Sequence, residues 1–103
     1  MIILTKDNFE DEISSYEGVA VIDLYADWCA PCKMLAPIVE ELSSELTEYK
    51  FCKVNVDDEP DVARLFKVES IPFIAFVKDN VFLDFSVGYV KKEKLSELIE
   101  KYK

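Results

Sequence analysis

Two cysteines with two residues between them, Cys29 and Cys32, are the residues of this chain best suited to chemistry. They stand in the run Trp28-Cys29-Ala30-Pro31-Cys32-Lys33, between an apolar β-branched stretch and a stretch with helical periodicity. The free N–H groups and the dipole at a helix N-terminus stabilise a thiolate on the first cysteine. The pattern therefore predicts thiol–disulfide exchange, with Cys29 as the nucleophile and the deeper Cys32 attacking its sulfur through a mixed disulfide.

Two other interpretations of this pair stay open. Half of a zinc site would need two further ligands, and the chain offers no His and a single additional cysteine, Cys52. A purely structural disulfide across two residues would constrain the unfolded chain very little. Cys52 lies in a separate apolar stretch, where a lone cysteine is usually inert core packing. Exchange chemistry is the interpretation that the pattern favours.

Composition limits the classes of function. The net charge is −9, whereas a nucleic-acid partner requires a positive face, so no nucleic-acid role is expected. The absence of His excludes Cys–His dyads and His metal ligands, and leaves proton transfer to a carboxylate, a lysine, a tyrosine or water. Residues 1–7 lack the features of a signal peptide, and no stretch is long enough to span a membrane. We expect a cytoplasmic protein without a membrane partner.

Asp23 is the next candidate, because it interrupts the otherwise apolar run Val19–Ala26. A strand that is apolar on both faces is central in its sheet, so this carboxyl would be desolvated and its pKa raised. Such a side chain would point beneath the helix that follows and could exchange a proton with Cys32. A structural pairing with lysine or a solvent-facing position is an equal alternative. Lys53 could lie beside Asp23 if their strands are neighbours, although the sequence by itself favours a solvent-exposed lysine.

Two further residues stand out by their positions. Trp28 is the only tryptophan and precedes the cysteine pair in an expected exposed loop, where it either contacts partners or packs locally. Pro72 precedes a strongly apolar stretch and belongs at the first position of a strand, because proline cannot donate to a sheet ladder. The sequence by itself gives little reason to expect a cis bond there.

Hydrophobic periodicity and turn residues predict the elements that position these side chains, within one domain over residues 1–103. The expected strands are Ile2–Leu4, Val19–Ala26, Phe51–Val56, Phe73–Val77 and Val81–Val87. The expected helices are Asn8–Ser15, Cys29–Glu48 with a kink at Pro37, a short one after Pro60, and a closing one through Leu95 and Tyr102. Strands separated by helices predict parallel pairing, and the final hairpin is antiparallel. The β-α-β-α-β-α-β-β-α order gives a mixed sheet with helices on both faces.

With these residues placed, the chain resembles the thioredoxin family along essentially its whole length. The resemblance rests on the segments Asp23–Lys33, Pro37, Lys53–Asp57, Ile71-Pro72 and Gly88. A lone Cys-x-x-Cys would be weak evidence. Trp-Cys-x-Pro-Cys-Lys together with the preceding Asp23 and a distant Ile-Pro is specific.

The resemblance implies an α/β thioredoxin fold and a dithiol that reduces protein disulfides, without a cofactor. It implies a Cys29–Cys32 disulfide in the oxidised form, re-reduction by a thioredoxin reductase, disulfide-containing client proteins and a monomeric state. Asp23 becomes the proton acceptor for Cys32, with Lys53 as its modulating neighbour. The residues implied in substrate contact are Trp28, Ile71, Pro72 in the cis form, and Gly88.

Three positions depart from the family pattern. Ala30 replaces the usual Gly, and because Ala30 and Pro31 tune the redox potential, that potential stays open. Phe73 replaces the usual Thr and is expected to narrow the groove or make it more apolar, which leaves the partner range open. Tyr25 stands where Trp or Phe is common.

Two competing functions remain. Oxidases or isomerases of the disulfide isomerase type often carry His between their cysteines, whereas this pair encloses Ala-Pro. A binding subunit with incidental cysteines is disfavoured by the joint presence of both cysteines, Asp23 and Pro72. A reductase is the leading interpretation.

Overall fold

Five strands form one mixed sheet in the computed structural model, which describes residues 1–103. They are β1 (Ile2–Ile3), β2 (Val19–Tyr25), β3 (Lys50–Asn55), β4 (Phe73–Lys78) and β5 (Val81–Val87). Their order across the sheet is β1-β3-β2-β4-β5, so β2 is central and β5 forms an edge. β1 and β2 pair in parallel with β3, while β4 pairs antiparallel with both β2 and β5.

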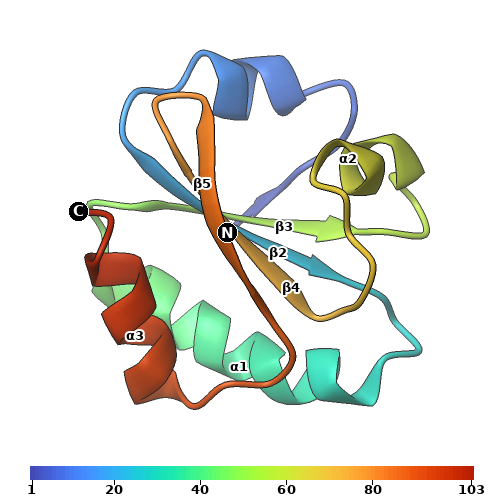
Figure 1. The fold of residues 1–103 in the computed structure, drawn as a ribbon, viewed down its shortest axis with the longest axis vertical. Helices are drawn as coiled ribbons and strands as arrows, with labels where there is room; N and C mark the ends of the chain where they lie inside the picture. The colour runs from blue at the N-terminus through green and yellow to red at the C-terminus, as the bar shows by residue number, and fades with distance from the viewer.

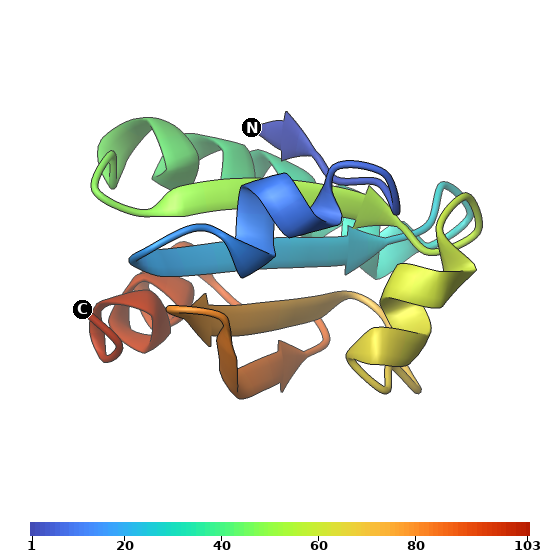
Figure 2. The same cartoon turned by 90° about the horizontal axis from the view of Figure 1, so that it is seen from above.

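The direction of β4 shows that the prediction of parallel pairing across a helix is wrong for this strand. The connecting helix α2 (Pro60–Leu65) has six residues and rises about 9 Å, whereas β3, also six residues, spans about 20 Å. The helix therefore does not carry the chain back along the sheet. β4 begins at the edge where β3 ends, and Figure 2 shows it running against β2.

Helices cover both faces of the sheet. The remaining ones are η1 (Glu10–Ser14), α1 (Ala30–Glu45) and α3 (Lys92–Glu100). Figure 1 shows α1 and α3 on one face, with η1 and α2 on the other. The predicted order of elements and the two-sided covering are confirmed.

Two helix boundaries differ from the prediction. η1 is a short π-helix that starts after Asn8, because Asn8 and Thr5 exchange hydrogen bonds in a turn: the Thr5 N–H donates to Asn8 Oδ1 at 2.7 Å, and the Asn8 N–H to Thr5 Oγ1 at 3.2 Å. α1 ends at Glu45 rather than Glu48 and contains Pro37.

Successive residues of β2 point to opposite faces and fill two separate apolar clusters. Ile22 and Leu24 pack toward η1 and α2, while Val21 packs toward α1 and α3; all three are fully buried. The alternation places Asp23 on the side of α1, the helix that carries Cys32. No helix of the structure is both long and apolar enough to cross a membrane.

Candidate active site

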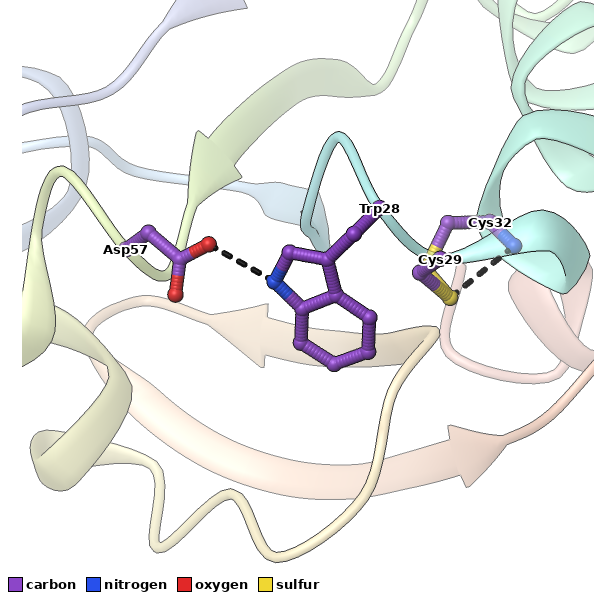
Figure 3. The surroundings of a disulfide bond; sticks show 4 residues. All are labelled: Trp28, Cys29, Cys32 and Asp57. Atoms are coloured by element: carbon purple, nitrogen blue, oxygen red, sulfur yellow. Dashed lines mark hydrogen bonds between the residues drawn. A yellow bond between two sulfur atoms is a disulfide. The ribbon is translucent and has the colours of Figure 1, made fainter.

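Cys29 and Cys32 are joined by a disulfide at the start of α1, with their Cα atoms 5.2 Å apart. Cys29 is the N-cap residue, and Pro31 lies in the first turn, where the N–H that proline lacks would have had no helical partner. The Cys32 N–H donates to Cys29 Sγ at 3.2 Å, as Figure 3 shows. A backbone donor and the helix dipole are thus aimed at the Cys29 sulfur, an arrangement that favours its thiolate.

Exposure barely distinguishes the two cysteines, since Cys29 is 5% and Cys32 is 3% exposed. They differ in their position on the helix, because Cys29 is the N-cap residue of α1 and Cys32 lies within its first turn.

Ile71 packs against the small cluster that the two cysteines form with Ala26. Ala30 and Pro31 between the cysteines are exposed, so a partner that approaches the disulfide meets them first.

Cys52 lies apart from this pair. It is fully buried in the apolar cluster under η1 and α2. Burial raises the pKa of its thiol to about 11, which keeps it protonated and unreactive. The prediction that Cys52 packs in the core is confirmed.

Asp23 is buried in β2, with an exposed fraction of 5%. Burial raises its pKa to about 7, and the positive charge of Lys53 opposes this shift only in part. The Asp23 Oδ1 has no hydrogen-bond partner within the protein. The predicted burial and raised pKa are confirmed, and the carboxyl titrates close to neutral pH.

Lys53 lies directly across from Asp23, because the two residues are in register between β2 and β3. It is half-buried, so the expectation of a solvent-exposed lysine is wrong. Its ammonium makes no ion pair within 4.0 Å of the Asp23 carboxyl, so their interaction is through space rather than through direct contact.

A cavity of about 160 Å³ connects this carboxyl with the disulfide. Its lining includes Asp23, Lys53 and Cys32, together with Ala36 and residues of the turn after β2. The space is large and polar enough to admit water. A proton can therefore pass between Cys32 and Asp23 through water without direct contact between the two side chains.

Trp28 projects from the surface beside the disulfide, with an exposed fraction of 70%. Its Nε1–H donates to Asp57 Oδ2 at 2.8 Å, as drawn in Figure 3. Asp57 is oriented in turn by its own N–H, which donates to Asn55 Oδ1 at 2.9 Å. Sequence reasoning missed Asp57 as a positioning residue. The one available signal was its place at the end of the segment Lys53–Asp57.

The loop before β4 completes the site. The Ile71–Pro72 peptide bond is cis, as the resemblance implies. The Gly88 N–H donates to the Pro72 carbonyl at 2.8 Å and so ties the end of β5 to this loop. Gly88 has a φ of +90°, and a Cβ there would have no heavy atom within 4 Å, so the space above it is open. Ile71 thus packs against the cysteines, and the hydrogen bond from Gly88 holds the end of β5 to the buried Pro72 that follows it.

Phe73 does not project toward the disulfide. Its side chain is 3% exposed and lies in the cluster under η1 and α2, where it stacks on Phe85 with ring centroids 4.9 Å apart. The alternative that Phe73 narrows the groove beside Pro72 is therefore wrong. The alternative that it makes a groove more apolar fits its place beside Ser70 and Val87 in the lining of a neighbouring groove. In β4, Phe73 points to the face opposite the one that carries Asp23.

Comparison with known proteins agrees with this geometry. The family model described as Thioredoxin matches residues 1–101. The thioredoxin of Staphylococcus saprophyticus is 42% identical over 103 residues, which cover 99% of this chain and 97% of that protein. The thioredoxin of Chlamydia trachomatis is 40% identical, covering 97% of this chain and 96% of its own. That of Bacillus subtilis is 41% identical, covering 95% and 93%. The chain thus belongs to the thioredoxin family and is a thiol–disulfide oxidoreductase with Cys29 and Cys32 as its redox pair.

Proposed function

We propose that the protein reduces disulfides of client proteins, with Cys29 as the attacking thiol and Cys32 as the resolving thiol. The Cys29 thiolate attacks one client sulfur, forms a mixed disulfide and releases the other client sulfur as a thiolate. Cys32 then attacks the Cys29 sulfur, which releases the second client thiol and closes the Cys29–Cys32 disulfide. Two electrons pass from the protein to the client. The position of Cys29 as the N-cap of α1 is the observation that carries this assignment.

Asp23 serves as the proton acceptor for Cys32 in the second step. A base with a pKa of about 7 is well matched to proton transfer near neutral pH. The shared cavity supports a water-mediated route between the two groups. Lys53 acts as a modulating neighbour, because its charge limits how far the pKa of Asp23 rises.

Client contact involves the residues around the disulfide, namely Trp28, Ile71, Pro72 and Gly88. Ala30 and Pro31 tune the redox potential from within the disulfide ring. A thioredoxin reductase restores the dithiol, and the protein works as a single-domain monomer without a cofactor. This reducing role fits the cytoplasm, where thiols are kept reduced.

Trapping of mixed disulfides tests the division of roles. Cys32→Ser should accumulate covalent complexes with a disulfide-containing protein such as insulin, because the resolving thiol is gone. Cys29→Ser should accumulate none, and the matched control Cys52→Ala should reduce insulin at nearly the rate of the unmodified protein. Equal trapping by the two serine variants would contradict the assignment. A redox potential in the range of oxidases would replace the reductase with the isomerase-type alternative.

A further inference from the structure

The edge strand β5 carries an apolar surface that the redox mechanism does not use. Its side chains with exposed fractions between 41% and 56% are Val81, Phe82, Leu83, Phe85 and Val87. Figure 2 shows β5 at the border of the sheet. Phe82, Phe85 and Val87 lie opposite buried β4 residues of the cluster under η1 and α2, so they share that face of the sheet.

Four phenylalanines turn this surface into a groove. Phe73 stacks on Phe85, and Phe66 meets Phe82 edge-on with ring centroids 5.0 Å apart. Phe66 and Phe73 are buried, while Phe82 and Phe85 are 41% and 52% exposed. The groove has a volume of about 500 Å³, and we call it the aromatic groove; its lining residues are Phe66, Lys67, Glu69, Ser70, Phe73, Phe82, Phe85 and Val87. Because these four rings already pack against each other, they lose little conformational entropy when a ligand binds, and this favours binding of an apolar side chain.

The aromatic groove adjoins the residues beside the disulfide at two points of the chain. Ser70 lines the groove and precedes Ile71, which packs against the cysteines. Val87 also lines it and precedes Gly88, which is hydrogen-bonded to Pro72. Every client disulfide has to reach Cys29, so a client segment that continues from its disulfide past Ile71 meets the groove at Ser70.

We propose that the aromatic groove binds a large apolar side chain of the client, close in sequence to the client's reactive cysteine. This inference rests on the proposed function. Phe85 lies three residues from Gly88, about 10 Å along an extended strand. A client chain that runs along β5 with its cysteine near Gly88 therefore places a residue about three positions away at Phe85. The groove carries one Lys and one Glu, so it selects by apolarity rather than by charge. A second copy of the chain is the weaker occupant, because two copies at a net charge of −9 repel each other.

Matched disulfide peptides test this preference. One peptide carries Phe three positions on each side of its cysteine, and the other carries Ser at both positions. The unmodified protein should reduce the Phe peptide with a kcat/KM about tenfold higher, as expected for burying part of one aromatic side chain. Phe85→Thr and Phe82→Thr should each lower that ratio to about threefold or less, while Thr retains the preference for strand conformation. Leu83→Thr is the control, because Leu83 is exposed on the same strand and does not line the groove.

Oxidised glutathione separates failure of the groove from failure of the redox pair, because it is too small to span both sites. Its reduction should be equal in all four proteins. Equal rates for the two peptides in the unmodified protein, or a preference that survives both Phe variants, would overturn the groove while leaving the reductase function standing. Sedimentation that revealed a dimer dissolved by Phe85→Thr would also overturn it, by assigning the groove to a second copy. Absence of any disulfide reduction by the unmodified protein would contradict the proposed function itself.

Discussion

The two sides of the Cys29–Cys32 disulfide are built in opposite ways. The outer side is exposed and consists of Trp28, Ala30 and Pro31. The inner side is buried or half-buried beneath α1 and consists of Asp23 and Lys53. Under the proposed function, residues that contact a partner lie on the outer side of the sulfurs and residues that exchange a proton lie on the inner side. Changes on the inner side should alter stability and pH dependence, whereas changes on the outer side should alter recognition and potential with little effect on the fold.

Among the changes considered for the two sides, replacing Asp23 should have the largest effect, and it should change the free energy of unfolding in a pH-dependent way. The pKa of Asp23 is 3.8 when unfolded and about 7 when folded, so the folded protein holds a proton that the unfolded chain releases in this range. Stability therefore falls as the pH rises from about 4 to about 7, by at most about 4 kcal/mol. Asp23→Asn should be more stable than the unmodified protein at pH 8, and this gain should largely vanish at pH 4. Denaturant unfolding at the two pH values measures it.

The same variant should slow the second step of the reaction. Release of product from the mixed disulfide should be slower on the order of a hundredfold, since a general base is lost, while the first attack by Cys29 suffers less. Single-turnover kinetics of a model disulfide against pH separates the two steps. Lys53→Met is the companion variant: removing the charge that lowers the pKa of Asp23 should move the rise of the resolution rate to higher pH. If Asp23→Asn is destabilised at pH 8 and its mixed disulfide is resolved at the rate of the unmodified protein, Asp23 and Lys53 have a structural role and take no part in proton transfer.

Sequence reasoning reached the inner side better than the outer side, for a physical reason. An apolar run with one carboxylate favours a central strand, and this pattern indicates both the burial of Asp23 and its raised pKa. The half-buried position of Lys53 escaped the sequence, because it depends on which strand lies beside β2. The Trp28–Asp57 hydrogen bond depends on how two loops from different strands approach each other, which no local pattern encodes. The direction of β4 and the burial of Phe73 likewise depend on where α2 ends in space. Such features appear only once the chain is folded.

On the outer side, we expect Asp57→Ala to have a moderate effect. Loss of the hydrogen bond to the exposed Trp28 ring should lower kcat/KM for insulin about fivefold, equivalent to roughly 1 kcal/mol, and leave glutathione reduction unchanged. Asp58→Ala is the matched control, because the Asp58 side chain makes no bond to Trp28.

Trp28 fluorescence should rise on reduction in both the Asp57 and the Asp58 variant, since the indole adjoins the disulfide that quenches it. An unchanged emission in the unmodified protein would place the ring away from the sulfurs in solution.

Ala30→Gly should give the smallest effect. Ala30 is exposed, starts α1 and lies inside the ring that the disulfide closes. Its Cβ stabilises the first helical turn, and we expect this stabilisation to differ between the oxidised and the reduced protein. The helix propensities of Ala and Gly differ by about 1 kcal/mol, and a two-electron couple moves about 30 mV for 1.4 kcal/mol. The redox potential should therefore shift by no more than about 20 mV, with the fold retained.

Equilibration against glutathione measures this shift in potential. Ala63→Gly in α2 is the control, because it carries the same helix penalty far from the cysteines in sequence. A potential equal to that of the unmodified protein would make Ala30 a neutral replacement, and a shift far beyond this bound would mean that residue 30 acts on the thiols by more than helix propensity.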